Sequence, residues 1–119
     1  MMQGAVISEK RAAYRQALDD ALERIRKRLA EIPQVQKAIL FGSSARGRRD
    51  LFTDLDLIVV MRSDLGFLER SVELRQRLEA GVDMDLLVYT PEEFERMAQG
   101  GFLAHVLETG QVIYEKNAA

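Results

Sequence analysis

The chain has 119 residues and a formal net charge of −2, with 17 Lys and Arg against 19 Asp and Glu. This length predicts one domain over residues 1–119, and an apolar share of 47% is typical of globular proteins. The absence of Cys excludes disulfides and thiolate zinc sites, and a single His excludes a polyhistidine metal site. Mild acidity argues against bulk nucleic-acid binding, and no apolar run approaches the roughly 18 residues of a membrane span. The N-terminus lacks the pattern of a secretory signal, so we expect a cytoplasmic protein without membrane contact.

The N-terminal quarter has the pattern of one amphipathic helix, from about Ser8 to Ile32. Its apolar residues recur at steps of three and four, Ser8 suits the N-cap, and Pro33 would stop the helix. Val35–Phe41 is rich in apolar residues and predicts the first strand.

A polar loop, Gly42–Asp50, is expected next, with a short helical turn after Ser44. The second strand is predicted over Thr53–Met61. Its second half is apolar at every position, which indicates a central strand covered on both faces. Leu65–Ala80 then has a helical pattern, with Ser63 or Asp64 as its cap and Gly81 at its C-terminal end.

The C-terminal part alternates strands and short helices. Val82–Tyr89 predicts the third strand, and Thr90–Glu93 has the residues of a capping box with Pro at the first helical position. That helix should break at Gly100-Gly101, before a second short helix over Phe102–Glu108 and a final strand over Val112–Glu115. This order predicts an α+β fold, a small mixed β-sheet of three to four strands backed by helices.

Carboxylates stand at the beginning of two predicted strands. Asp54 and Asp56 lie two residues apart, so strand alternation places both on one face of the sheet. Asp83 and Asp85 repeat this pattern on the third strand, and their equal parity does not separate them. If the two strands are neighbours, three or four carboxylates meet there, and oxygen ligands of this kind select Mg²⁺ or Mn²⁺. Solvated residues at the strand entrances are the alternative interpretation.

The loop after the first strand has the composition of a phosphate site. Gly42 allows backbone N–H groups to approach an anion, a helical turn would direct its positive end at that anion, and Ser43 adds a hydroxyl. Arg46 adds a cation. Short loops of Gly and Ser are more often plain turns, so the loop gains weight only together with the acids.

The segment GSSARGRRDLFTDLDLIVV, with Asp85 on a later strand, resembles the DNA-polymerase-beta-like nucleotidyltransferase superfamily. It is most similar to the minimal nucleotidyltransferases, which are encoded beside HEPN-domain toxins as their antitoxins. The resemblance runs from the first helix to the last strand. It implies the polymerase-beta-like palm fold, with ATP as substrate and two Mg²⁺ ions, or Mn²⁺, as cofactors.

The resemblance also implies roles for individual residues. Gly42 and Ser43 would hold the β- and γ-phosphates of a nucleoside triphosphate, with Arg46 as a further phosphate contact. Asp54 and Asp56 would bind both metals, and Asp85 would complete one metal site and help to activate the acceptor hydroxyl; Asp83 is the fallback for this third acid.

The resemblance implies a protein adenylyltransferase that attaches AMP to a tyrosine of a HEPN toxin, as the antitoxin of a type VII-like toxin–antitoxin pair and part of a hetero-oligomer. Two alternatives remain: an antitoxin that neutralises its toxin by binding alone, and a nucleotidyltransferase for small molecules. The retained acids argue against the first, because carboxylates crowded without a metal would repel one another. The lack of an appended substrate domain argues against the second.

Overall fold

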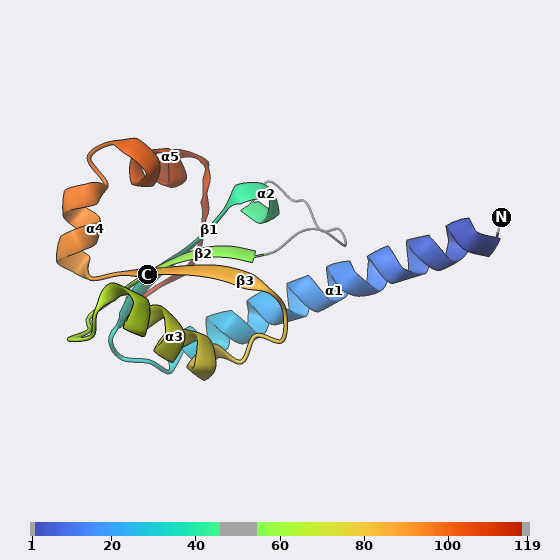
Figure 1. Ribbon diagram of the computed structural model, residues 1–119, viewed down its shortest axis with the longest axis horizontal. Coiled ribbons are helices and arrows are strands. Elements are labelled where there is room, and N and C mark those ends of the chain that lie inside the picture. The colour runs from blue at the N-terminus through green and yellow to red at the C-terminus, as the bar shows by residue number, and fades with distance from the viewer. Residues whose placement is uncertain (1, 46–54, 118–119) are drawn as a thin grey trace.

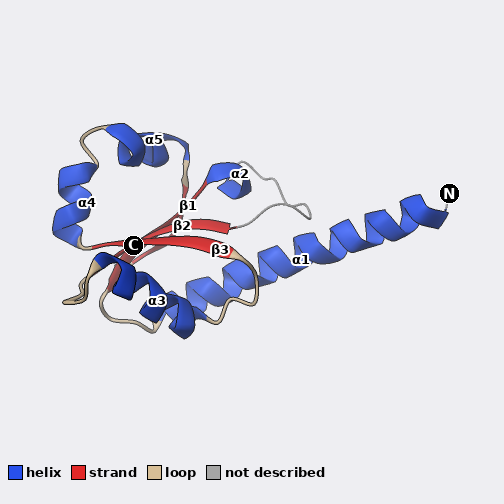
Figure 2. Cartoon of the chain, viewed as in Figure 1, coloured by secondary structure: helices blue, strands red, loops and turns tan. Residues whose placement is uncertain are grey.

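The computed structural model describes residues 2–45 and 55–117, and for residues 2–8, 43 and 44 it describes the backbone alone. Within these residues the elements are α1 Met2–Ala30, β1 Val35–Phe41, α2 Gly42–Ala45, β2 Leu55–Met61, α3 Phe67–Leu78, β3 Met84–Tyr89, α4 Pro91–Met97, α5 Gly101–Thr109 and β4 Gln111–Glu115 (Figures 1 and 2). No helix among them is both long enough and apolar enough to cross a membrane.

The four strands form one mixed sheet in the order β3-β2-β1-β4. The pairs β1–β2 and β1–β4 are antiparallel, whereas β2–β3 is parallel. This confirms the predicted α+β fold with a small mixed sheet. The parallel pair brings the beginnings of β2 and β3 to the same edge of the sheet, where the end of antiparallel β1 also lies.

Helices cover both faces of the sheet. One face packs against α1 and α3 in the main core, to which β2 contributes Leu55, Leu57 and Val59. The other face carries a smaller core in which Ile39 and Ile58 of the sheet meet residues of α5. In Figure 1, α1 and α3 lie below the strands and α4 and α5 above them. The double cover explains the apolar second half of β2.

Several predicted boundaries need correction. The first helix begins at Met2, so Ser8 lies inside it and is not its N-cap. The cap of α3 is Gly66, without a side-chain hydrogen bond, because Ser63 Oγ accepts instead from the Leu65 N–H at 3.1 Å. At the other end of α3 the C-cap is Glu79, in the left-handed conformation, instead of the predicted Gly81.

The remaining elements agree more closely with the sequence. The first strand has the predicted bounds, and the third begins at Met84 instead of Val82. The helical turn after β1 begins at Gly42, before the expected position. The break at Gly100-Gly101 separates α4 from α5 as predicted.

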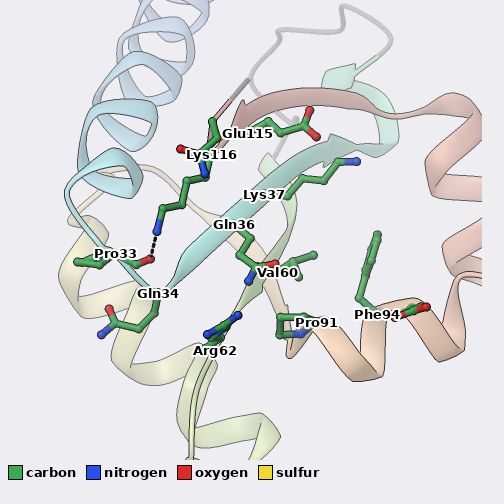
Figure 3. A pocket seen from close by; sticks show the side chains of 12 residues that line it. Pro33, Gln34, Gln36, Lys37, Val60, Arg62, Pro91, Phe94, Glu115 and Lys116 are labelled. Carbon is green, nitrogen blue, oxygen red and sulfur yellow. Dashed lines mark hydrogen bonds between the residues drawn. The ribbon is translucent and has the colours of Figure 1, made fainter. Parts of the chain in front are cut away.

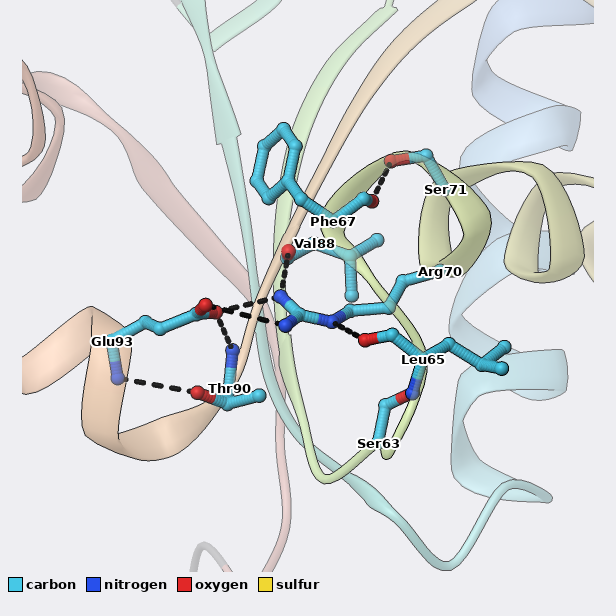
Figure 4. Close-up of polar contacts among 8 residues, drawn as sticks. All are labelled: Ser63, Leu65, Phe67, Arg70, Ser71, Val88, Thr90 and Glu93. Atoms are coloured by element: carbon cyan, nitrogen blue, oxygen red, sulfur yellow. Dashed lines mark hydrogen bonds and ion pairs between the residues drawn. The ribbon is translucent and has the colours of Figure 1, made fainter.

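A polar cluster fastens α4 to α3 across the edge strand β3 (Figure 4). The Arg70 side chain is 8% exposed, and its guanidinium donates to both carboxylate oxygens of Glu93, at 2.6 and 3.2 Å. It also donates to the carbonyls of Leu65 and Val88. Glu93 accepts from the Thr90 N–H and its own N–H donates to Thr90 Oγ1, which confirms the capping box. The hydrogen bonds from Arg70 are the main reason why the pKa of Glu93 falls from 4.5 to about 2.

We predict that Glu93→Gln lowers the free energy of unfolding by about 1–2 kcal/mol at pH 7, since a charge-assisted bond to a buried Arg is weakened. Gln still offers a side-chain oxygen that can accept from the Thr90 N–H, so the substitution measures the effect of the lost charge. Glu95→Gln, on the same helix and exposed, is the control. Because the folded pKa lies below the unfolded one, the ionised carboxylate contributes stability that is complete above about pH 4.5 and disappears as pH falls toward 2. Chemical denaturation at pH 7, 5 and 3 should therefore show the difference between Glu93→Gln and wild type shrinking with acid; a constant difference would contradict this.

Candidate active site

The predicted acids come together at the edge of the sheet where β2 and β3 begin. Asp56 is the register partner of Phe41 on β1 and of Asp85 on β3. The neighbours of each residue along its strand, such as Leu40, Leu57 and Leu86, pack in the core under α1 and α3. Alternation therefore directs Phe41, Asp56 and Asp85 to the opposite face, the side of α4 and α5. We call these three residues the acid row.

The acid row is partly open to solvent. Asp56 is half-buried and Asp85 is exposed. Strands that pair lie about 4.8 Å apart, so the two carboxylates begin from neighbouring positions on one surface. Two like charges at this separation disfavour each other unless a cation lies between or beside them. The row thus has the charge and the oxygen donors of a site for a hard divalent cation.

Gly42 lies directly against the acid row. It is the first residue of α2 and has a φ of +73°, a conformation that L side chains rarely adopt. A Cβ at this position would lie 2.5 Å from Asp56 Oδ2, so only glycine leaves room for the carboxylate. The absence of a side chain at Gly42 therefore allows the end of β1 to lie close to Asp56 at the beginning of β2.

The two candidates for the third acid differ in their surroundings. Asp85 lies opposite Asp56, whereas Asp83 precedes the strand, and its carbonyl accepts from the Leu55 N–H at 3.2 Å. Asp83 also lines a groove of about 600 Å³ that includes Tyr14 of α1. Asp83 and Asp85 have the same parity in the sequence. In the structure, Asp85 is the register partner of Asp56 and Asp83 is not.

Three predicted site residues are not fully visible. Asp54 and Arg46 lie outside the described residues, and of Ser43 only the backbone is described. Among the residues that the structure describes, no three acidic or His side chains form a metal-binding group. The described part of the predicted site therefore consists of Gly42, Asp56, Asp85 and the backbone of Ser43.

A larger groove of about 650 Å³ lies elsewhere, at the opposite end of the sheet (Figure 3). Its lining combines Lys37, Val60 and Arg62 with Phe94 of α4 and Lys116 after β4. Lys116 Nζ donates to the Pro33 carbonyl at 2.8 Å. No residue of the acid row lines this groove, so its size alone does not make it the candidate site.

Sequence reasoning overlooked the aromatic side of the site. The sequence indicates Phe41 only as the last residue of a strand, yet Phe41 belongs to the acid row and contacts Phe102 of α5, with ring centroids 5.5 Å apart. Strand alternation relative to buried Leu40 would have indicated its face, but its nearness to Asp56 depends on the register of a pair distant in sequence.

Comparison with known proteins identifies the family. The family model described as "Polymerase beta, Nucleotidyltransferase" matches residues 23–119. The chain belongs to this nucleotidyltransferase family. A relative from Methanocaldococcus jannaschii, named "putative protein adenylyltransferase", is 32% identical over 83 residues, which cover 68% of this nucleotidyltransferase and 80% of the relative.

Solved structures share the fold at lower identity. The crystal structure of "a putative nucleotidyltransferase from Sulfolobus solfataricus" has a TM-score of 0.59 and 16% identity, and covers 95% of this chain and 90% of that one. A toxin-antitoxin structure with AMP-PNP has a TM-score of 0.52 and 22% identity, over 81% and 74% of the two chains. A structure of a variant of the toxin-antitoxin MntA-HpeT has a TM-score of 0.51 and 23% identity, over 80% and 72%. These likenesses agree with the nucleotidyltransferase fold.

We predict that Gly42→Ala destabilises the nucleotidyltransferase by at least about 1–2 kcal/mol, the cost of the left-handed conformation for an L residue. The new Cβ must also displace the Asp56 carboxylate, so binding of a nucleoside triphosphate, the substrate class of this family, should fall together with the thermal midpoint. Gly100→Ala is the matched control, because its φ is −170° and no atom lies within 4 Å of its added Cβ. Equal effects of the two substitutions would contradict the close approach of Gly42 and Asp56.

Proposed function

We propose that this nucleotidyltransferase is a Mg²⁺-dependent protein adenylyltransferase that moves AMP from ATP to a hydroxyl group. The observation that carries the proposal is the alignment of Asp56 with Asp85 on one face, with Gly42 against Asp56. The named activity of the relative from Methanocaldococcus jannaschii supports AMP and a protein acceptor.

The two acids of the acid row, Asp56 and Asp85, fit a hard metal ion. Their donors are carboxylate oxygens, the chain contains no Cys, and such a donor set favours Mg²⁺ or Mn²⁺ over zinc. Asp54, two residues before Asp56, would add a third carboxylate from the same strand face. When bound, two such ions neutralise charge on the phosphates and on the attacking and leaving oxygens.

The chain's own residues then divide the work. Backbone N–H groups at Gly42 and Ser43 bind the β- and γ-phosphates, and Arg46 adds a cationic contact. The oxygen of the acceptor hydroxyl forms a bond to the α-phosphorus, and Asp85 takes the proton that this hydroxyl loses. The bond between the α-phosphorus and the bridging oxygen breaks, and pyrophosphate leaves with the electron pair.

The partner that we propose is a HEPN-domain toxin, with one of its tyrosines as the acceptor. The chain would act in the cytoplasm, as the antitoxin within a hetero-oligomer. The support comes from the toxin-antitoxin structures, one of which holds AMP-PNP. Another MntA-HpeT structure carries two Asp-to-Glu changes two residues apart, the spacing of Asp54 and Asp56 here.

We predict that Asp56→Asn and Asp85→Asn each weaken Mn²⁺ binding, measured by calorimetry with ATP present, by about tenfold or more. Asn keeps the size of the side chain and removes the charge. Asp83→Asn is the matched control, since Asp83 is also exposed and lies two residues from Asp85 but has no register partner in the acid row. A larger loss with Asp83→Asn than with Asp85→Asn would move the third acid to Asp83.

Co-expression separates catalysis from neutralisation by binding. We expect wild-type protein to protect cells from the HEPN toxin and to raise the intact mass of the toxin by one or more AMP units. The double variant Asp54→Asn, Asp56→Asn should still fold, because both changes are nearly isosteric, but should neither modify the toxin nor protect. Equal protection by both proteins without a change in mass would falsify enzymatic neutralisation and leave an antitoxin that acts by binding.

A further inference from the structure

The acid row has an aromatic end. Phe41, Asp56 and Asp85 are successive register partners on β1, β2 and β3, and all three face α4 and α5. Across strands spaced by about 4.8 Å, the row passes from an aromatic ring to one carboxylate and then to a second. A surface with an apolar end and an anionic, cation-binding end is complementary to a molecule that has a flat base at one end and phosphates at the other.

Phe102 enlarges this aromatic end. It comes from the first turn of α5, and its ring meets that of Phe41 edge to face, with centroids 5.5 Å apart and planes at 82°. Phe102 is 50% exposed, whereas its neighbours Leu103 and Val106 are 2% exposed and fill the core under α5. The ring of Phe102 thus contributes less to the core than these residues do, and it offers apolar surface beside the acid row.

The position of the aromatic pair relative to the loop selects its ligand. Phe41 directly precedes Gly42, so the pair and the proposed phosphate loop lie on the same side of Asp56. A molecule whose phosphates contact Gly42 and the metals therefore has its remaining part within reach of the pair. The acceptor must approach the proposed proton-accepting Asp85, which lies at the opposite end of the row.

We propose that Phe102, supported by Phe41, forms the platform on which the nucleobase of the nucleoside triphosphate stacks. This inference rests on the proposed function and adds a residue that determines affinity for the base. An aromatic ring can stack on any base, and the favourable free energy of stacking increases with the size of the base. The platform should therefore bind purines more tightly than pyrimidines.

The test compares ATP with inorganic triphosphate, both with Mg²⁺, by calorimetry on the purified chain. Phe102→Ala should weaken ATP binding by about 5- to 150-fold, the range for loss of one base–aromatic stack, and leave triphosphate binding unchanged. Phe102→Tyr keeps the ring and should bind ATP as wild type does. Leu107→Ala is the matched control, because Leu107 is 42% exposed on the same helix and is truncated in the same way. Thermal unfolding of each variant establishes that it is folded, and Phe102→Leu replaces the Ala variant if that one is not.

The outcomes separate the platform from the proposed function. Equal losses of ATP and triphosphate, or unchanged ATP binding with the Ala variant, would overturn the platform while leaving a nucleotide site. Normal ATP binding with slower transfer to a protein acceptor would also overturn it, since the ring would then serve the acceptor. If wild-type protein binds neither ATP nor triphosphate, the proposed function itself fails, and the platform with it.

Discussion

Strand β2 is packed on both faces, and this constraint decides where the molecule can hold charge. Leu55, Leu57 and Val59 are fully buried under α1 and α3, and Ile58 is fully buried on the other side. A carboxylate in the middle of this strand would lose its hydration without compensation, at a cost of several kcal/mol. Asp56 is the charged residue of the strand and lies next to its beginning, where it is only half-buried. The chemistry of the site is therefore confined to the edge where strands begin and end.

The same packing fixes the geometry of the acid row. A shift of one residue between β2 and β3 would turn Asp85 toward α1 and bring Leu86 or Met84 to the site face. Such a slip is opposed by the burial of Met84, Leu86 and Val88, because these side chains would leave the main core for the face on which Asp85 is exposed. The register that stabilises the core is thus the register that places Asp56 beside Asp85. Gly42 completes the arrangement, since a larger residue there would displace the carboxylate.

Much of this fold could be predicted because its signals are local. The capping box at Thr90–Glu93, the break at Gly100-Gly101 and the apolar run of β2 each depend on neighbouring residues, and each agrees with the structure. The predicted cap of α3 was wrong because Ser63 Oγ accepts from the nearer Leu65 N–H. Residue propensities do not distinguish this local bond from a helix cap. The predicted beginning of α1 was wrong because Ser8 suits an N-cap but is also tolerated inside a helix.

What the sequence could not provide is contact between distant segments. Alternation assigned faces to Asp56 and Asp85, but their register depends on the crossover through α3, which no local pattern determines. Arg70 illustrates the same limit, since it is separated from Glu93 by 23 residues and its burial follows from the packing of two helices on one edge strand. The meeting of Phe41 and Phe102 likewise requires α5 to return over the end of β1.

The acid row and Phe102 beside it are held by different contacts. Asp56 and Asp85 are fixed by strand pairing and by the main core beneath them, which are insensitive to charge. Phe102 belongs to α5, which follows α4, and α4 contains no fully buried side chain. The position of α4 depends on partly buried Phe94, which packs against the smaller core, on its Thr90 cap and on the ion pair of Glu93 with buried Arg70. Weakening this ion pair should therefore act on α4 and, through the connection to α5, on Phe102 before it disturbs the acids, so that the proposed base platform and the proposed metal site respond separately to changes in α4.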